Sequence, residues 1–361
     1  MPQARDIGLA VIGSGRIGTL RARLASKHPA VRFLAVADKS PENARKLAEK
    51  VGADFHTGDN LAAISRPEVN AVIVSTSEHQ HTEPVLAALR LGKPVLCEKP
   101  IGLNLADADT VLDAIAKYNG NVRYGYSRRF KHRYLTVKEQ VTQGKLGQIT
   151  GGHARAYNLR TQGEKAQERS AGISPIVYSL TYYIDLMCWF MENNPVVEVV
   201  ARGHGLGKPA GGQVPHDLTW AMLTLADGAV MDLGIYYALP EKYPSRGLSS
   251  RLELVGTDGV IVIDGDNTDQ VMFSEKGVPH VHLPNQDAKL VFLGSSTPGA
   301  WAVGDFWGPL ADETRAWLDF LSTGRPCALA TAQDARNNLE ISLAIERSAY
   351  TRQTVRLPIE R

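Results

Sequence analysis

The sequence contains little cysteine, few aromatic residues and almost no net charge. Three cysteines occur in 361 residues, and neither their number nor their spacing fits a disulfide framework or a zinc site. We therefore expect reduced thiols and a cytoplasmic protein. The formal net charge of +2 is too small to indicate binding to nucleic acid or to an acidic membrane surface.

Long hydrophobic runs are also absent. The most apolar stretch, residues 176–191, is interrupted by Ser179, Thr181 and Asp185, so no membrane-spanning segment is expected. The N-terminal residues lack the pattern of a signal peptide. The composition, 43% hydrophobic and 22% charged, is that of a globular protein, and 361 residues exceed the usual size of one core. The chain is therefore predicted to form two domains.

A glycine-rich turn between apolar segments is the most informative motif. The turn GSGRIG at residues 13–18 follows the strand-like run 7–12 and opens a helical pattern, and Asp38 ends the next strand-like run, 20 residues after Gly18. In such a βαβ unit the glycines allow a tight turn and a close approach of the backbone to a pyrophosphate. The sequence therefore predicts a dinucleotide-binding site. The alternative is an ordinary strand–turn–helix that needs glycine only for its backbone.

Asp38 also bears on the choice of cofactor. A carboxylate at this position accepts hydrogen bonds from both ribose hydroxyls and repels a 2′-phosphate, which favours NAD. Lys39 and Ser40 follow it and would accommodate that phosphate if Asp38 turned away. NADP therefore stays open.

Strand and helix patterns alternate over residues 1–125 and predict a Rossmann domain with a doubly wound parallel sheet. Ser40 is expected to cap one of its helices, with Gly52 at the end, and Thr82 another. Ligands on parallel sheets bind beyond the carboxyl ends of the strands. The segments around Gly15, Thr76 and Lys99 all lie at such ends, so we expect them to gather on one rim.

Residues 126–361 have a different pattern, which predicts an α+β domain with a large, mostly antiparallel sheet. Asp227-Gly228 and Asp258-Gly259 each separate two β-rich runs, as in hairpins. Residues 159–173 and 238–247 are expected to be loops that shape a pocket.

Helices complete the second part of the chain. One is expected to begin at Ser174-Pro175, and two more lie near the C-terminus, at 311–321 and 333–350. Thr331 and Asp334 form a plausible capping pair for the last of them.

Two groups of side chains have the chemistry for catalysis. An ammonium at Lys99, on the expected rim, could hold a substrate hydroxyl and stabilise a developing alkoxide; a solvated loop lysine is the alternative. Tyr178, Tyr182, Asp185 and Trp189 recur at spacings of four, three and four residues and would share one helical face. Such a stripe is more often core packing. However, a buried carboxylate needs partners, and a phenol beside a lysine can donate or accept a proton.

These segments carry a family resemblance. GSGRIG at 13–18, LRLGKPVLCEKP at 89–100 and YGYSRRF at 124–130 resemble the Gfo/Idh/MocA oxidoreductase family, and the likeness covers nearly the whole chain. The resemblance implies a Rossmann domain, an open-faced sheet that mediates oligomers, and a nicotinamide ring near a catalytic Lys99. It also implies a cis peptide bond between Lys99 and Pro100.

The departures from the family pattern concern the substrate side. Many members carry Asp-x-Gly-x-His-x-x-Asp where this chain reads Tyr178 to Asp185, so only the last aspartate is kept. The histidine position is Tyr182, which resembles the dihydrodiol dehydrogenase and glucose–fructose oxidoreductase branches, where tyrosine is the acid/base. Tyr178 in place of the first aspartate departs from the inositol-dehydrogenase type of site. The family's Thr-Pro-Asn is replaced by residues 76–78, Thr-Ser-Glu.

The motifs and the resemblance together give the candidate site residues. The expected catalytic residues are Lys99 and Tyr182. The expected substrate contacts are Asp185, Asn158, Tyr178 and Arg129. The expected cofactor contacts are Gly13, Ser14, Gly15, Arg16, Ile17, Asp38, Lys39, Ser75, Thr76, His81, Glu98, Lys99 and Arg128. No metal site is expected, because the histidine pairs 79/81 and 280/282 lack further ligands at recognisable spacing.

We therefore expect an NAD(P)-dependent dehydrogenase or reductase that acts on a secondary alcohol, or its ketone, in a sugar, polyol or cyclic diol. Its expected partners are that small molecule and further copies of itself, as a homodimer or homotetramer through the C-terminal sheet; nucleic acid and membranes are not expected. Two alternatives stay open. One is a nucleotide-sensing regulator without catalysis, and the other is an enzyme with retained NAD that transiently oxidises a sugar during a lyase or hydrolase reaction.

Overall fold

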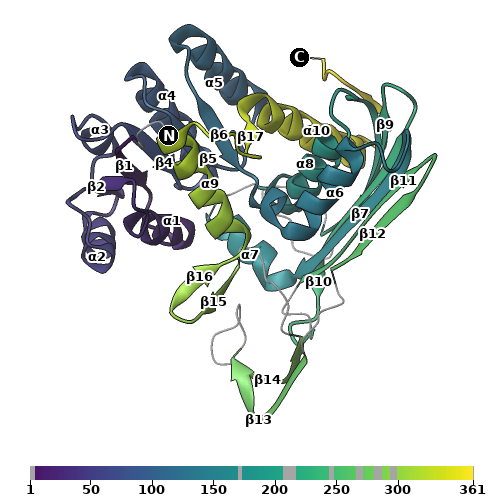
Figure 1. Ribbon diagram of the computed structural model, residues 1–361. Coiled ribbons are helices and arrows are strands. Elements are labelled where there is room, and N and C mark those ends of the chain that lie inside the picture. Colours follow the sequence, from purple (N-terminus) through teal and green to yellow (C-terminus); the bar gives the residue numbers. More distant parts are fainter. Residues whose placement is uncertain are drawn as a thin grey trace. The chain divides into compact units, whose positions relative to one another are not determined.

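The computed structural model describes residues 5–169, 173–205, 217–243, 248–265, 271–279, 287–292 and 299–360. The chain forms two compact units (Figure 1). The first unit is Met1–Lys131 with Thr297–Asn337, and the second is His132–Ser296 with Asn338–Arg361. These units interleave along the chain, whereas the expected domains, 1–125 and 126–361, are continuous segments. That domain division stays a prediction.

The first unit is built on a seven-stranded sheet of order β17-β6-β5-β4-β1-β2-β3. Its members are β1 (Ile7–Ile12), β2 (Val31–Ala37), β3 (Phe55–Thr57), β4 (Ala71–Val74), β5 (Val95–Glu98), β6 (Val122–Gly125) and β17 (Ala330–Thr331). All neighbours pair in parallel except β17, which is antiparallel to β6. Because β1 has β2 on one side and β4 on the other, the strand order reverses there, as in a doubly wound Rossmann sheet. The predicted fold of this part is confirmed.

Helices surround this sheet. They are α1 (Arg16–Ser26), α2 (Pro41–Val51), α3 (Asn60–Ile64), α4 (Thr82–Arg90), α5 (Leu105–Tyr118) and α9 (Pro309–Thr323), with short turns η1 (Glu78–Gln80) and η2 (Ser127–Phe130). The predicted ends of α2 are confirmed: Ser40 Oγ accepts from Asn43 N, and Gly52 is left-handed at φ +67°. The predicted Thr82 cap is wrong. His81 already has helical dihedral angles because η1 leads straight into α4, so Thr82 is the first helical residue.

The core of the first unit explains why α9, from late in the chain, belongs to it. Every residue of β1 is buried, as expected for a parallel strand covered on both faces. Trp317 and Leu318 of α9 are fully buried in the cluster that contains Leu9 and Val11. Burying such side chains stabilises the fold by about 1.5–3 kcal/mol each. The apolar side chains of α9 therefore pack this late segment against the first sheet.

The second unit has its own seven-stranded sheet, of order β12-β11-β7-β10-β9-β8-β18. Its members are β7 (Ile149–Leu159), β8 (Val196–His204), β9 (Leu218–Leu225), β10 (Val230–Leu239), β11 (Leu248–Gly256), β12 (Val260–Asp264) and β18 (Val355–Arg356). Only β7 and β10 pair in parallel. Both predicted hairpins are confirmed, β9 with β10 and β11 with β12. Two small ribbons add β13 (Val271–Pro279), β14 (Asp287–Phe292), β15 (Ala300–Ala302) and β16 (Asp305–Trp307).

The two faces of the second sheet differ. Along β9, residues 219, 221, 223 and 225 are buried while the intervening ones are not. One row across the outer face, in register, is Val262, Glu253, His153, Asp232, Met222 and Val200. Met222 and Val262 are each 52% exposed. Helices α6 (His132–Thr142) and α8 (Thr181–Phe190) lie along one face in Figure 1. The part of the chain that the structure describes places no helix on the outer face, as expected for an open-faced sheet.

Three helical expectations in this part need comment. Residues 160–169, expected to be a loop, form helix α7 (Arg160–Arg169), because this run is rich in good helix formers. The helix expected from Ser174-Pro175 is not a continuous α-helix: it begins with a π-helical turn, η3 (Ile176–Leu180), before α8. The second expected loop, 238–247, is partly strand β10 and ends outside the described residues.

The last helix, α10 (Ala332–Thr351), has the predicted capping pair. Asp334 N donates to Thr331 Oγ1 at 3.1 Å, and Thr331 N donates to Asp334 Oδ2 at 2.9 Å. Among the described helices, none combines the length and the hydropathy needed to cross a membrane.

Candidate functional site

The glycine turn has the backbone that a dinucleotide site needs. Gly13 has φ +99°, and a Cβ there would lie 2.6 Å from Ser75 O. A Cβ on Gly18 would lie 1.9 Å from Gly13 O, so neither position admits a side chain. Gly15 differs: its φ is ordinary, at −67°, and a Cβ there would meet nothing within 4 Å. Glycine at 15 therefore leaves open space at the start of α1, where a phosphate could approach the backbone.

Asp38 is fixed beside this turn. Its Oδ2 accepts from Ser14 N at 2.7 Å, and its Oδ1 accepts from Ser40 N at 2.9 Å. Each carboxylate oxygen keeps a second lone pair, so both can still accept from ribose hydroxyls. Turning Asp38 away would break both hydrogen bonds. The geometry therefore favours the cofactor without a 2′-phosphate.

Orphaned polar groups lie along the same turn. No side chain caps α1, whereas Ser40 caps α2 and Asn104 caps α5. The hydroxyl oxygens of Ser14 and Ser75 are buried and lack a hydrogen-bond partner. Buried polar groups normally have a hydrogen-bond partner, so a bound ligand would supply the partners that these two hydroxyls lack. The donor set fits the pyrophosphate and sugar of a dinucleotide.

His81 connects the ends of β4 and β5. The imidazole is 1% exposed, with Nδ1 2.9 Å from Pro100 O and Nε2 3.2 Å from Thr76 O. Burial lowers the pKa of His81 below its ordinary value, although both carbonyl groups oppose the shift. The peptide bond between Lys99 and Pro100 is cis, as expected. The two contacts of His81 link the segments around Thr76 and Lys99, and the close approach of Gly13 to Ser75 adds the glycine turn. The three segments therefore share one rim, as predicted.

Lys99 lies on this rim and is only 8% exposed, so it is not a solvated loop lysine. The residue before it, Glu98, is held by Arg21, which the sequence patterns do not single out. Arg128 and Arg129, on η2, are each 4% exposed, and Arg129 Nη2 lies 3.4 Å from Asp334 Oδ2. The remaining candidates for the cofactor, Arg16, Ile17 and Lys39, lie at the surface or half-buried next to the turn.

The second unit holds the expected substrate contacts Asp185, Asn158 and Tyr178, whereas the fourth, Arg129, belongs to the first unit. Asp185 is 1% exposed and accepts from Asn338 Nδ2, on α10, at 2.9 Å. The buried carboxylate thus has the partner that its burial requires. Tyr178 and Tyr182 are half-buried. Because Tyr178 lies in the π-helical turn, its direction does not follow from the 3.6-residue spacing, and such turns often occur at functional sites.

Asn158 offers a second polar group in this unit. It is 5% exposed on β7, in register with Tyr237 of β10 and Leu248 of β11, and its Nδ2 has no hydrogen-bond partner. A buried amide in this state suits a substrate hydroxyl. Next to it, Tyr237 Oη hydrogen-bonds Ser179 Oγ of the π turn. Neither Tyr237 nor Asn338 belongs to a motif, so only their register and packing reveal them.

The candidates therefore fall into two groups. Lys99, Arg129 and the cofactor residues are in the first unit, and the other candidates are in the second, namely Tyr178, Tyr182, Asp185 and Asn158. Their meeting around one substrate stays a prediction. Within the described ranges, no cluster of three or more histidine, cysteine or carboxylate residues is arranged to hold a metal. The pair at 280 and 282 lies outside the described residues.

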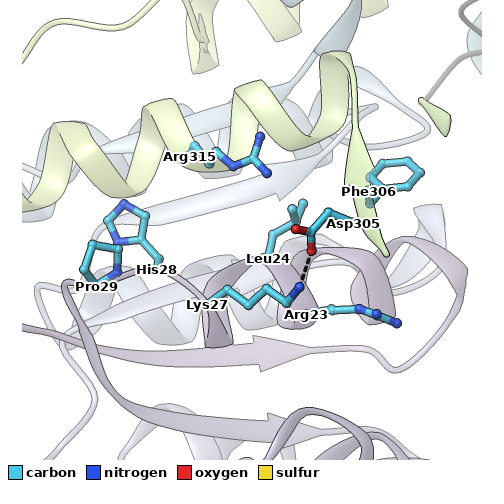
Figure 2. Close-up of a pocket in the computed structure, with 8 residues that line it drawn as sticks. All are labelled: Arg23, Leu24, Lys27, His28, Pro29, Asp305, Phe306 and Arg315. Atoms are coloured by element: carbon cyan, nitrogen blue, oxygen red, sulfur yellow. Dashed lines mark hydrogen bonds and ion pairs between the residues drawn. The ribbon is translucent and has the colours of Figure 1, made fainter. Parts of the chain in front are cut away.

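A cavity of about 240 Å³ lies elsewhere in the first unit. Figure 2 shows it at the C-terminal end of α1, where Lys27 points at its ion-pair partner Asp305 and Arg315 lies close by. The first residue of α1 that lines it is Arg23, seven residues after Arg16, so the cavity is separated from the glycine turn by about 10 Å of helix. It is not part of the rim.

Comparisons with known proteins agree with this geometry. A family model described as an oxidoreductase family with an NAD-binding Rossmann fold matches residues 7–126, and one for the family's C-terminal alpha/beta domain matches residues 138–357. Myo-inositol 2-dehydrogenase of Thermotoga maritima is 25% identical, over 97% of this chain and 98% of that protein. The 2,7-anhydro-N-acetylneuraminate hydratase of Mediterraneibacter gnavus is 27% identical, over 72% of this chain and 68% of that protein.

Solved structures share the fold. The scyllo-inositol dehydrogenase of Lactobacillus casei, crystallised with NAD(H) and scyllo-inositol, superimposes with a TM-score of 0.80 at 21% identity. The match covers 98% of this chain and 99% of that one. At this identity, the likeness establishes the architecture of both units.

Proposed function

Because the chain belongs to the Gfo/Idh/MocA family of NAD-binding oxidoreductases, we propose that its substrate is a cyclic polyol or a related cyclic diol, oxidised at one secondary alcohol. The enzyme is an NAD-dependent dehydrogenase that acts on CH–OH groups. The observation that carries the proposal is the buried Lys99, directly after β5, on the rim that also holds the glycine turn. A regulator without catalysis would not need this lysine, so that alternative is set aside.

The cofactor side of the site combines the backbone of the glycine turn with side chains at the ends of the strands. The turn at 13–18 and the N-terminus of α1 would hold the pyrophosphate, and Asp38 the ribose hydroxyls. When bound, NAD supplies the hydride acceptor. The remaining residues proposed to contact it are Ser75, Thr76, His81, Glu98, Lys99 and Arg128, with Lys39 at the ribose end.

Oxidation of a secondary alcohol removes a hydride from carbon and a proton from oxygen. We propose that Lys99 binds the oxygen of this alcohol, and that its ammonium stabilises the alkoxide as the O–H bond breaks. Tyr182 relays the hydroxyl proton: its Oη takes that proton as its own phenolic proton leaves to water. Asp185, already bonded to Asn338, orients neighbouring polar groups. Substrate hydroxyls would be held by Asn158, Tyr178 and Arg129.

The substrate class follows from the relatives and from Tyr178 and Tyr182. Several relatives are named for inositols, which are cyclic polyols. Tyrosines at the positions where that type of site has aspartate and histidine give fewer charged contacts to hydroxyls and more aromatic surface. This favours a ring with fewer hydroxyl groups, such as a cyclic diol, over a fully hydroxylated one.

Asp38 makes the cofactor preference testable. Replacing Asp38 with alanine removes the charge that repels a 2′-phosphate and the acceptor for Ser14 N and Ser40 N. We expect the preference for NAD over NADP to fall by about 10–100-fold, that is by about 1.4–2.7 kcal/mol. Fluorescence titration with NADH and NADPH measures it. Tighter binding of NADPH than NADH by the unaltered protein would contradict the preference.

The assembly and location belong to the same proposal. The outer face of the second sheet exposes Met222, Val260 and Val262, and apolar patches of this kind are usually covered by another protein surface. We propose a homodimer or homotetramer through this face. A cytoplasmic location is proposed only because Cys97, Cys188 and Cys327 form no disulfide bond.

Substitution of Lys99 tests the function directly. Lys99→Ala should lower kcat by about 10²–10⁴-fold on a cyclic polyol or diol while NADH still binds. Lys99→Arg is the matched control: it keeps a cation but donates no proton at accessible pH, so partial activity would identify charge stabilisation as the main role. Unchanged turnover in Lys99→Ala would refute the assignment.

A second candidate function rests on the hydratase among the relatives. An enzyme of that kind would retain NAD and use it transiently within a net non-redox reaction. Absorbance of the purified protein at the nicotinamide bands, before and after dialysis against NAD-free buffer, separates the two. Cofactor that never exchanges, together with turnover that accumulates no NADH, would favour the second candidate.

A further inference from the structure

The cavity at the C-terminal end of α1 is formed by three segments that are far apart in the sequence (Figure 2). Its volume is about 240 Å³, which is room for roughly eight water molecules. The end of α1 forms one wall, β16 a second and α9 a third, and all three belong to the first unit. A ligand of modest size therefore fits here.

Cations outnumber carboxylates on the lining of this cavity. Arg23, Lys27 and Arg315 are charged near pH 7, and Asp305 is the one carboxylate among the described residues that line it. All three cations act on Asp305. A hydrogen bond from Lys27, together with the charges of Lys27, Arg23 and Arg315, lowers the pKa of that carboxyl group. The lining thus has an excess of positive charge.

Both arginines keep donors for a further partner. Arg23 Nη2 makes a long contact of 3.4 Å with Gly304 O, and its guanidinium lies 4.5 Å from the ring centre of Trp301. Arg315 Nη1 lies 3.5 Å from Asp312 Oδ1 in an exposed pair within α9. A guanidinium has five N–H groups, and exposed pairs of this kind contribute little to stability. Either arginine can therefore bind an anion at small cost.

Helix geometry explains only part of this cluster. The carbonyl groups at the end of α1 attract cations, which accounts for Arg23 and Lys27 but not for Arg315, in the middle of α9. The same carbonyl groups disfavour an anion, but their partial charge is about half an electron, less than that of one cation. The carboxylate of Asp319, 3.1 Å from His28, is half-exposed and outside the lining, so water screens it.

Apolar side chains form the buried part of the lining. Leu24 of α1 and Phe306 of β16 are both buried, and they belong to a small core cluster with Leu310 and Ala311 of α9. This cluster packs the three segments together. The backbone that carries the three cations is therefore held in place, and a ligand with a short carbon body would find an apolar surface beside them.

We propose that this cavity binds a phosphate dianion, either free or as the monoester of a small organic molecule. The terminal oxygens of phosphate point in several directions, and the three cations come from two helices on different walls. Guanidinium groups match pairs of phosphate oxygens, and lysine adds a point charge. A carboxylate has only two oxygens, in one plane, and would leave one cation without a contact. The phosphate competes with Asp305 for Lys27, an exposed ion pair that is easily opened.

A ³¹P NMR titration of the NADH-saturated protein at pH 7.5 tests this proposal, with inorganic phosphate and phenyl phosphate as the two probes. Bound NADH keeps phosphate away from the glycine turn, and its pyrophosphate signals are separate from those of both probes. Both probes are mainly dianions at this pH. Tighter binding of phenyl phosphate would identify a monoester whose carbon body contacts Leu24 and Phe306. Equal or tighter binding of inorganic phosphate would identify the free ion.

Variants of the lining should change the affinity in both directions. Arg315→Gln and Lys27→Gln should each weaken phosphate binding by about tenfold, because each removes a charged donor. Asp305→Asn should strengthen it by about threefold, because the competing carboxylate is lost. Arg325→Gln is the matched control: this arginine is exposed, follows α9 and does not line the cavity, so the affinity should be unchanged.

The opposite signs separate a site from loosely held counter-ions. No binding of either probe to the unaltered protein would overturn the proposal, and so would equal affinities in Arg315→Gln and Arg325→Gln. Thermal melts and NADH titrations show which variants keep the fold. If Arg315→Gln does not fold, Lys27→Gln and Asp305→Asn decide the question, because unchanged affinity in both would also overturn the proposal.

Discussion

The two seven-stranded sheets present their functional groups in opposite ways. In the first, β1 and β4 are buried along their whole length, so their functional groups lie beyond the strand ends. In the second, strands such as β9 have a buried and an outer face, and candidate groups such as Asn158 lie within a strand. The first sheet therefore concentrates function at one edge, while the second distributes it over side chains.

This difference determines what holds each half of the site. On the first sheet, backbone geometry forms most of the site. Gly13 and Gly18 fit because they lack a Cβ, and Asp38 accepts hydrogen bonds from backbone amides. In the second unit the partners are side chains from remote segments, as with Asp185 and Asn338. Substitutions in the first sheet should act through conformation, and those in the second through lost partners.

Two glycine substitutions in the turn of the first sheet should have the largest effect on NADH binding. In Gly18→Ala the Cβ would lie 1.9 Å from Gly13 O, a clash with backbone that can be relieved only by opening the turn. We expect loss of NADH binding by more than about 100-fold, or about 2.7 kcal/mol, and a lower melting temperature.

Gly15→Ala is the matched partner. Its Cβ meets no protein atom within 4 Å, and its φ is compatible with alanine, so the melting temperature should be unchanged. NADH binding should still weaken by about tenfold, because the methyl group occupies the space beside the helix N-terminus. Fluorescence titration and thermal melts measure both. Full affinity in Gly15→Ala would show that the pyrophosphate does not approach there.

A charge on the outer face of the second sheet should have the next largest effect. Met222→Glu places a carboxylate at a position that is 52% exposed and beside Asp232 in register. If a second copy covers this face, the substitution occurs twice in a two-fold interface and should weaken self-association by about 100-fold, or about 2.7 kcal/mol.

Leu61→Glu is the control for this prediction, because Leu61 of α3 is 56% exposed in the first unit. Sedimentation at several protein concentrations gives the association constants, and NADH affinity should be unchanged in both variants. An identical mass distribution for Met222→Glu and the unaltered protein would show that this face is not the interface.

The sequence predicts the first sheet better than the second, for a physical reason. The strands, α2 with its Ser40 cap and the glycine turn all depend on local periodicity and backbone geometry. The return of α9 to the first core depends on Trp317 meeting residues about 300 positions earlier, which no local pattern encodes. The sequence predicts a loop where α7 lies, because that polar run has no apolar stripe to mark a helix.

The candidate site divides in the same way. Gly13, Asp38 and Lys99 belong to motifs, and their gathering on one rim follows from strands ending at one edge. Arg21 belongs to no motif, and only its burial and its two carboxylate partners reveal it. The π-helical turn at Ile176–Leu180 also escapes a spacing rule that assumes 3.6 residues per turn.

The smallest expected effect concerns the pH dependence of stability at the rim. Burial lowers the pKa of His81 below its ordinary value of about 6.5, so the unfolded chain binds the proton first as pH falls. The stability associated with neutral His81 is complete above about pH 6.5 and is lost below it, until the folded protein also binds the proton. Within that window each pH unit costs up to about 1.4 kcal/mol.

Urea denaturation at pH 7.5, 6.5 and 5.5 measures this slope. His81→Asn should be less stable at pH 7.5, because it loses the ring between Thr76 and Pro100, but its stability should fall less between pH 6.5 and 5.5. His79→Asn, an exposed histidine two residues earlier, is the control and should keep the slope of the unaltered protein. An equal slope in His81→Asn would mean that carboxylates elsewhere dominate acid unfolding. The His81 side chain would then contribute little to the pH dependence of stability at the rim. The contrast with the second unit, where side chains such as Asn338 are the partners, would be sharper.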